Sequence, residues 1–107
     1  MKQLLVATSA AALSVEVAAA CELDISDYVG WTIIYSGTVT GYIDENGQVQ
    51  DQFNGCTHNR VLIVDNDKAV TCNEYSYSYA YRPDIVILSN GPSLKACIDD
   101  EMYDVRR

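Results

Sequence analysis

The sequence is poor in the residues on which several common functions depend. It has one histidine, and its seven lysine and arginine residues face fifteen aspartate and glutamate residues, giving a formal net charge of −8. Nucleic acids and anionic membrane surfaces attract proteins that present clusters of basic side chains. The composition therefore argues against both as partners. It predicts either a well-solvated protein or a protein whose negative electrostatic field attracts a basic partner.

Catalytic motifs are also scarce. No serine lies in a Gly-x-Ser-x-Gly turn, and the single histidine, His58, follows Cys56 by two residues in a polar stretch. A cysteine–histidine pair can form a thiolate nucleophile. The cysteines of an exported chain, however, are more commonly joined in disulfides. We therefore expect no catalysis, and a hydrolase built on His58 and a carboxylate is the enzymatic alternative.

Patterns of metal ligands are weak as well. The chain has no C-x-x-C pair, the usual basis of a zinc site. Three acidic turns, at residues 44–47, 65–67 and 99–101, could offer oxygen ligands to calcium, but none has the twelve-residue pattern of an EF-hand. Aspartate and asparagine are also ordinary turn formers. We expect no metal and no cofactor.

The first twenty residues have the pattern of a secretory signal peptide. Lys2 gives a basic start, residues 4–13 are apolar, and three alanines occupy positions 18–20. The apolar run is shorter than the ~20 residues that span a bilayer, so we expect no transmembrane segment. We predict cleavage after Ala20, with residues 21–107 forming a single domain in the periplasm or outside the cell. Removal of residues 1–20 takes away one base, Lys2, and one acid, Glu16, and so leaves the balance at −8.

The four cysteines suggest two disulfides in the mature chain. Such a small exported domain commonly needs covalent cross-links. Four cysteines allow three pairings; we prefer Cys56–Cys72, which closes a local loop, with Cys21–Cys97, which ties the N-terminus to a late strand. The alternative for Cys21 is a lipid anchor, although bacterial lipoproteins usually carry leucine where this chain has Ala18.

The mature chain reads as a series of short strands separated by turns. Helical periodicity is almost absent, β-branched and aromatic residues dominate, and Asn46-Gly47 suits a two-residue hairpin turn. Glycines inside the strand pattern at residues 31–43 indicate bulges or sharp bends. Residues 60–64 are apolar in succession and predict a strand buried on both faces. Six or seven such strands predict an all-β protein, a small and partly open antiparallel barrel of SH3-like or OB-like shape.

Four tyrosines recur at every second position in residues 75–81; we call Tyr75, Tyr77, Tyr79 and Tyr81 the tyrosine row. In an extended chain they line one face, because alternate side chains point the same way. We expect this face to point inward and supply area to a small core. The alternative is an exposed aromatic surface for a protein, peptide or glycan ligand, to which Arg82, Trp31 and Tyr35 could add.

These observations favour a binding or structural module of the cell envelope without catalytic activity. Its expected contact surface is the tyrosine row with Arg82. The alternative function is an acidic inhibitor that docks on a basic extracellular or wall-degrading enzyme, because a strong negative field raises the association rate with a positive partner.

Overall fold

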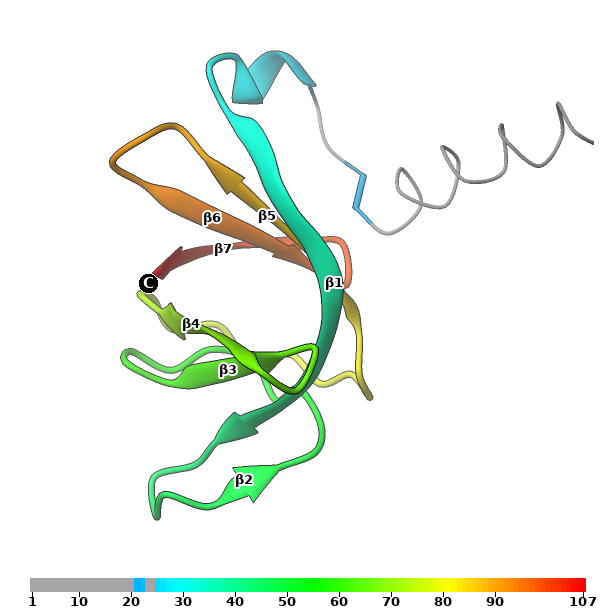
Figure 1. The fold of residues 1–107 in the computed structure, drawn as a ribbon, viewed down its shortest axis with the longest axis vertical. Coiled ribbons are helices and arrows are strands. Elements are labelled where there is room, and N and C mark those ends of the chain that lie inside the picture. Colours follow the sequence, from blue (N-terminus) through cyan, green and yellow to red (C-terminus); the bar gives the residue numbers. More distant parts are fainter. Residues whose placement is uncertain (1–20, 23–24) are drawn as a thin grey trace, which may run out of the picture.

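The structure is a computed structural model that describes residues 21–22 and 25–107 (Figure 1). The predicted signal peptide, its cleavage site and residues 23–24 lie outside the described residues. Within those ranges, no helix is long and apolar enough to cross a membrane.

The described chain is built almost entirely of strands. A short 3-10 helix, η1 (Ile25–Tyr28), precedes the first of them. The strands are β1 (Thr32–Ile43), β2 (Val49–Gln50), β3 (Val61–Val64), β4 (Lys68–Cys72), β5 (Asp84–Ser89), β6 (Leu94–Ile98) and β7 (Glu101–Arg106).

The strands close into an antiparallel barrel, as the sequence predicts. Their order is β2-β1-β3-β4-β7-β6-β5, and an additional pairing of β5 with β1 completes the ring. The long strand β1 makes this possible because its first half pairs with β5 and its second half with β3. The β4–β7 contact has only two residue pairs, Thr71 with Arg106 and Cys72 with Val105. The β3–β4 and β5–β6 hairpins therefore diverge on one side of the barrel (Figure 1).

Strand β1 turns the corner of the barrel through irregular pairing. Its register shifts between Ile33 and Tyr35, where it pairs with β5, and between Val39 and Gly41, where it pairs with β3. A side chain at Gly41 would overlap the carbonyl oxygen of Gln50, so the close approach of β2 requires glycine. The glycine-rich strand pattern therefore marks a bend, as expected.

The barrel buries one main core and a smaller cluster outside its wall. The main core has Val39, Phe53, Leu62, Ile85, Tyr103 and other side chains in one contiguous group. The second cluster joins Val86 and Leu88 to the Cys21–Cys97 disulfide, with Trp31 and Met102 packed against it. Strand β5 therefore contributes to both, and the residues between Ile85 and Leu88 are all buried.

The prediction of a doubly buried strand at residues 60–64 is wrong. In β3, Leu62 and Val64 are buried whereas Val61 and Ile63 are only partly covered. The sequence of the strand is apolar throughout, but burial of an outer face needs a second layer. That layer, built by Cys21 and Trp31, lies over β5 instead.

Both preferred disulfides are confirmed. Cys21 bonds to Cys97 across 76 residues and Cys56 to Cys72 across 16, and none of the four cysteines is free. The first disulfide joins the start of the described chain to β6, and the second joins the loop before β3 to the end of β4.

Candidate functional site: an exposed row of tyrosines

The tyrosine row lies on an extended segment that connects β4 to β5. Two backbone bridges hold this segment against residues 53–56: Phe53 pairs with Ala80, and Cys56 pairs with Ser76. Each bridge has two N–H···O bonds, of 2.9 and 3.0 Å at Phe53 and of 2.7 and 2.9 Å at Cys56. The disulfide from Cys56 to Cys72 adds a covalent restraint just before the row. The segment is thus fixed along its length although it lies outside the seven strands.

The row faces solvent, so the expectation that it forms the core is wrong. Tyr75, Tyr77, Tyr79 and Tyr81 are 76%, 85%, 61% and 65% exposed. The alternation itself is as predicted, since the intervening Ser76, Ser78 and Ala80 are partly covered. Four large side chains exposed in a line form an unusual surface, because isolated aromatic residues are common on proteins whereas contiguous patches mark contact sites.

The physical reason for this orientation is lack of room under the segment. Phe53 and Tyr103 already fill the adjacent core, with their rings in edge-to-face contact at 5.7 Å between centroids. The backbone of Gly55 also touches the segment, because a Cβ there would overlap backbone atoms of Ser76 and lie 2.8 Å from the nitrogen of Ser78. Only small side chains fit at such a close approach, so the tyrosines point outward.

The segment also presents a free backbone edge. In an extended chain, the N–H and C=O groups of one residue point to one side and those of its neighbours to the other. Ser76 and Ala80 use theirs to bond residues 53–56. Within the described part of the chain, the N–H and C=O groups of Tyr75, Tyr77 and Tyr79 make no backbone hydrogen bond. Such an edge can accept a further strand.

A ring or a charge lies at each end of the row. The imidazole of His58 stacks on Tyr75, with 6.3 Å between centroids and 21° between planes. At the other end, the guanidinium of Arg82 lies 5.6 Å from the centre of the Tyr81 ring. Arg82 has a positive φ of 49°, which turns the chain after Tyr81. Arg82 therefore lies beside the row, as predicted, and His58 extends it.

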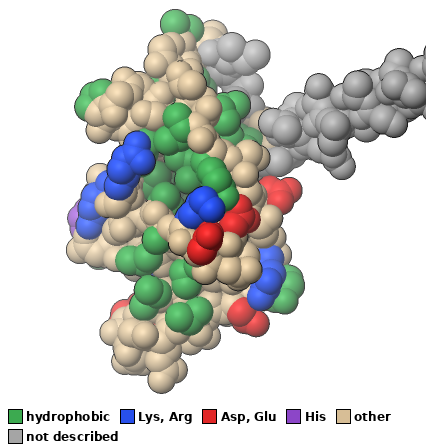
Figure 2. Space-filling model, in the orientation of Figure 1, with side chains coloured by type: hydrophobic (Ala, Val, Ile, Leu, Met, Phe, Trp, Pro, Cys, Tyr) green, Lys and Arg blue, Asp and Glu red, His purple; other side chains and the backbone are tan. Residues whose placement is uncertain are grey.

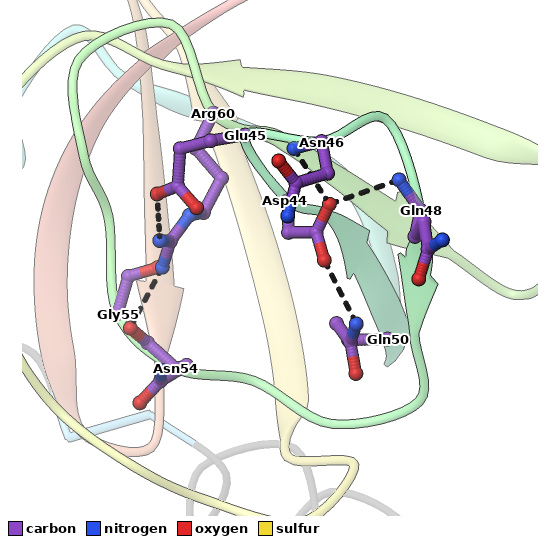
Figure 3. Close-up of polar contacts among 8 residues, drawn as sticks. All are labelled: Asp44, Glu45, Asn46, Gln48, Gln50, Asn54, Gly55 and Arg60. Carbon is purple, nitrogen blue, oxygen red and sulfur yellow. Dashed lines mark hydrogen bonds and ion pairs between the residues drawn. The ribbon is translucent and has the colours of Figure 1, made fainter.

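The loop under the row is held by Arg60, whose side chain is only 8% exposed. It donates hydrogen bonds to the carbonyl oxygens of Asn54 at 2.9 Å and Gly55 at 3.3 Å, and it pairs with Glu45 at 3.4 Å (Figure 3). Its guanidinium also lies 4.4 Å from the centre of the Tyr42 ring. An arginine side chain that is largely covered and satisfies carbonyl groups fixes the loop. Through Gly55, it also fixes the position of the tyrosine segment that packs on the loop.

A shallow hollow of about 230 Å³ adjoins the His58 end of the row. Its lining comes from both paired segments and from the arginine beneath them: Asn54, Cys56, Thr57, Arg60, Tyr75, Ser76 and Tyr77. The hollow gives the row a recess in which a side chain or ring of a ligand can be partly enclosed.

The carboxylate of Asp44, on the neighbouring hairpin, organises the Asn46-Gly47 turn. It accepts bonds from the backbone of Asn46 and Gln48 and from the side chain of Gln50, each at 2.9 Å (Figure 3). These donors, the Gln48 backbone first, lower the pKa of Asp44. The acidic residues of this turn therefore have a structural role, as turn formers commonly do.

The Cys56–Cys72 disulfide bears on one catalytic alternative, the cysteine–histidine pair. Cys56 is in a disulfide, so it offers no thiolate to His58. Over residues 21–22 and 25–107, no three histidine, cysteine, aspartate or glutamate side chains gather as ligands to a metal would.

Trp31 and Tyr35, the further candidates for the aromatic surface, make their contacts away from the row. Trp31 packs against the second hydrophobic cluster. The hydroxyl of Tyr35 donates to Asp65, and this bond raises the pKa of Tyr35 and lowers that of Asp65.

Sequence reasoning missed a cationic hollow elsewhere on the barrel, lined by Trp31, Lys95, Arg106 and Arg107 among others. A signal was present, because Arg106-Arg107 is a doublet of basic residues in an acidic chain. The doublet alone does not indicate a hollow, since nothing in the sequence places Trp31 beside residues near position 100.

Comparison with known proteins gives no relative: no family model, curated protein or solved structure matches this chain.

Proposed function

We propose that the protein is an exported, non-enzymatic binding module whose ligand is an extended peptide segment of another protein. The observation that carries this proposal is the tyrosine row, with side chains 61% to 85% exposed on a segment whose backbone is held in place. An exposed row that is already ordered loses little conformational entropy on binding. Tyrosine is suited to such surfaces because it offers a large contact area with few rotatable bonds.

The free backbone edge favours a peptide over a glycan as the ligand. A peptide added as a strand would bond the N–H and C=O groups of Tyr75, Tyr77 and Tyr79, which lack backbone partners within the described residues. In an extended chain, every second side chain recurs at about 6.7 Å. The rings of the row would therefore match the alternate side chains of a peptide that binds beside it as a strand. Main-chain bonds would supply affinity, and the rings would select the side chains that lie over them.

The test is a peptide array probed with the mature protein and with the Tyr77→Ser/Tyr79→Ser variant. We expect selected peptides to bind the wild-type protein and to lose about tenfold or more in affinity for the variant. Methylation of alternate backbone nitrogens in a selected peptide should abolish binding in one register and spare it in the other. The proposed mode is wrong if both methylated forms bind as well as the parent, or if linear oligosaccharides bind where peptides do not.

A second candidate function is docking on a basic extracellular enzyme. It rests on the net negative charge of the chain and on a cluster of acidic side chains at one turn. The Cys21–Cys97 disulfide brings Glu22 to the turn at residues 99–101, where its N–H bonds the Asp100 carboxylate at 2.7 Å. An inhibitor of this kind would bind faster at low ionic strength. An association rate with a basic wall hydrolase that stays unchanged from dilute buffer to about 0.5 M salt would exclude it.

A further inference from the structure

Two hollows meet on the side of the barrel where the hairpins diverge. One, of about 540 Å³, is mostly polar and is lined by Trp31, Lys95 and Arg106 among others. The other, of about 290 Å³, is mostly apolar, although Lys68 and Arg107 also line it. Leu94 and Arg107 line both, so the two hollows are adjacent, and we call them together the trough, with a polar half and an apolar half. Figure 2 shows this face: apolar side chains gather near its centre, with basic side chains to the upper left and a further basic group to the right that is bordered by acidic side chains.

The apolar half of the trough gives access to the core. Its walls include Val64, Val70, Ile87 and Leu94, all core residues, and Ile34 stands at its rim with 45% of its surface exposed. The side chains of one wall come from β3 and β4 and those of the facing wall from β5 and β6. These four core side chains are at most 8% exposed, so only their ends line the slot. A slot with this lining favours an alkyl chain.

The polar half concentrates positive charge in a chain whose net charge is −8. Lys95 is paired with Asp104 at 2.5 Å. Arg106 instead donates to neutral acceptors, the carbonyl of Cys72 at 3.2 Å and the side-chain oxygen of Asn59 at 2.5 Å. Among the described residues, no carboxylate forms an ion pair with Arg106 or Arg107. Two unneutralised guanidinium groups adjoining an apolar slot favour an anionic head group.

We infer that this trough binds a single-chain amphiphile with a carboxylate head group, of the fatty-acid class. The alkyl chain would lie in the apolar half against Leu94 and Ile87. The carboxylate would lie in the polar half, within reach of Arg106 and Arg107, because guanidinium groups form paired bonds with carboxylates. The size is suitable, since sites for small molecules commonly enclose about 300–1,000 Å³. This site is separate from the tyrosine row, and neither proposal depends on the other.

The experiment uses the only tryptophan of the chain, Trp31, which lines the polar half of the trough. Its emission is followed while dodecanoate is added, below the concentration at which the amphiphile forms micelles. We expect a saturable spectral change with one ligand per chain, checked by native mass spectrometry. Affinity should fall about threefold to fourfold for each methylene removed, in the series dodecanoate, undecanoate, decanoate. This series uses the wild-type protein and so does not depend on whether any variant folds.

Matched variants then test each half of the trough. Arg106→Gln/Arg107→Gln should weaken dodecanoate binding about tenfold or more, and Arg106→Lys/Arg107→Lys by less, since the charge is kept. Ile34→Asn should reduce the dependence on chain length. Tyr77→Ser, in the tyrosine row, is the control and should leave binding unchanged.

Four results would overturn the inference. The first is the absence of a saturable change with dodecanoate. The second is equal binding of acetate and dodecanoate, which would indicate a site for small anions only. The third is equal binding of dodecyltrimethylammonium, which would mean that the arginines do not select the head group. Binding to anionic lipid vesicles without binding of the free amphiphile would also contradict it, because the occupant would then be a membrane surface.

Discussion

Six of the eight tyrosines of this chain fall into two groups with opposite environments, and the contrast explains the exposed surface. Tyr103 and Tyr42 lie in strands of the barrel and are 1% and 6% exposed. The tyrosine row lies on a connecting segment and is largely exposed. The side chains are identical, so the residue type does not determine whether a ring is buried or exposed. What differs is the space behind the backbone: the barrel interior accommodates a ring, whereas the contact with Gly55 leaves room only for the small side chains of Ser76 and Ser78.

This comparison also separates stability from binding. A buried ring stabilises the folded state through its buried apolar area and its packing contacts, which truncation removes. An exposed ring contributes little to the free energy of unfolding, and its surface stays available to a ligand. If the contrast is correct, substitutions in the two groups should have very different effects on the free energy of unfolding.

The largest effect is expected at Tyr103. Tyr103→Ala should lower the free energy of unfolding by about 3–5 kcal/mol, because it removes a fully buried ring that packs edge-to-face on Phe53. Denaturant unfolding followed by circular dichroism measures this. The control Tyr103→Phe keeps the ring and loses the bond of its hydroxyl to Glu101, so it should lose only about 1 kcal/mol. A loss below 1 kcal/mol for the alanine variant would contradict the claim that the buried Tyr103 ring stabilises the fold.

The next effect concerns the contact that turns the row outward. Gly55→Ala should destabilise the protein by about 2–3 kcal/mol, because Gly55 has a φ of 78° and its added methyl group would meet the backbone of Ser76 and Tyr77. Gly47→Ala is the matched control, with a φ of 80° and open space around the added methyl group. It should lose only the strain of its backbone, about 1 kcal/mol. Equal losses for the two variants would show that the close approach does not matter.

A smaller effect should appear at alkaline pH. Burial, together with the bond to Glu101, raises the pKa of Tyr103 to about 12. The unfolded chain releases this proton near pH 10, whereas the folded chain holds it, so the contribution is complete below pH 10 and is lost as pH rises toward 12. We expect unfolding experiments to show a loss of about 1–2 kcal/mol across this range from Tyr103.

The control for this pH dependence is Tyr103→Phe, which has no phenol at that position. It should show a shallower decline than the wild-type protein between pH 10 and 12. Some decline should remain, because the bond to Asp65 raises the pKa of Tyr35 and acts in the same direction. Identical slopes for the two proteins would contradict the assignment to Tyr103.

The smallest effect on stability is expected in the row itself. Tyr77→Ser and Tyr79→Ser should each change the free energy of unfolding by no more than about 0.5 kcal/mol, because both rings are exposed. The same substitutions should remove peptide binding, as proposed above. A loss of several kcal/mol would mean that the rings support the fold after all.

Much of the fold could be predicted from local patterns. The strand-forming residues and the glycines near the bend of β1 are signals carried by neighbouring positions. The sequence also locates the turn at Asn46-Gly47, but the predicted two-residue form is wrong: residues 44–48 separate β1 from β2, and only Gly47 of the pair has a positive φ, of 80°. The two disulfides also agree with the preferred pairing of the four cysteines, in which one bond closes a local loop and the other ties the N-terminus to a late strand. Spacing alone left three pairings open.

The orientation of the row could not be predicted in the same way. Because the tyrosines occur at every second position, they must lie on one face of the extended segment. The spacing does not show whether that face points toward the barrel or toward solvent. That depends on Phe53 and Gly55, which lie some twenty residues earlier in the chain and meet the segment only after folding. The small residues at positions 76, 78 and 80 were the available clue, since small side chains suit a close approach. The trough was unpredictable for the same reason, because Trp31 and Arg106 meet only in the folded barrel.

The most direct test of the account is the reactivity of the individual tyrosines in the native protein. Brief nitration with tetranitromethane, mapped by mass spectrometry, measures which phenol rings are accessible. We expect the four tyrosines of the row to react readily, and Tyr42 and Tyr103 to be protected until the protein unfolds. Protection of Tyr77 and Tyr79 equal to that of Tyr103 would place the row in the interior and contradict the central claim.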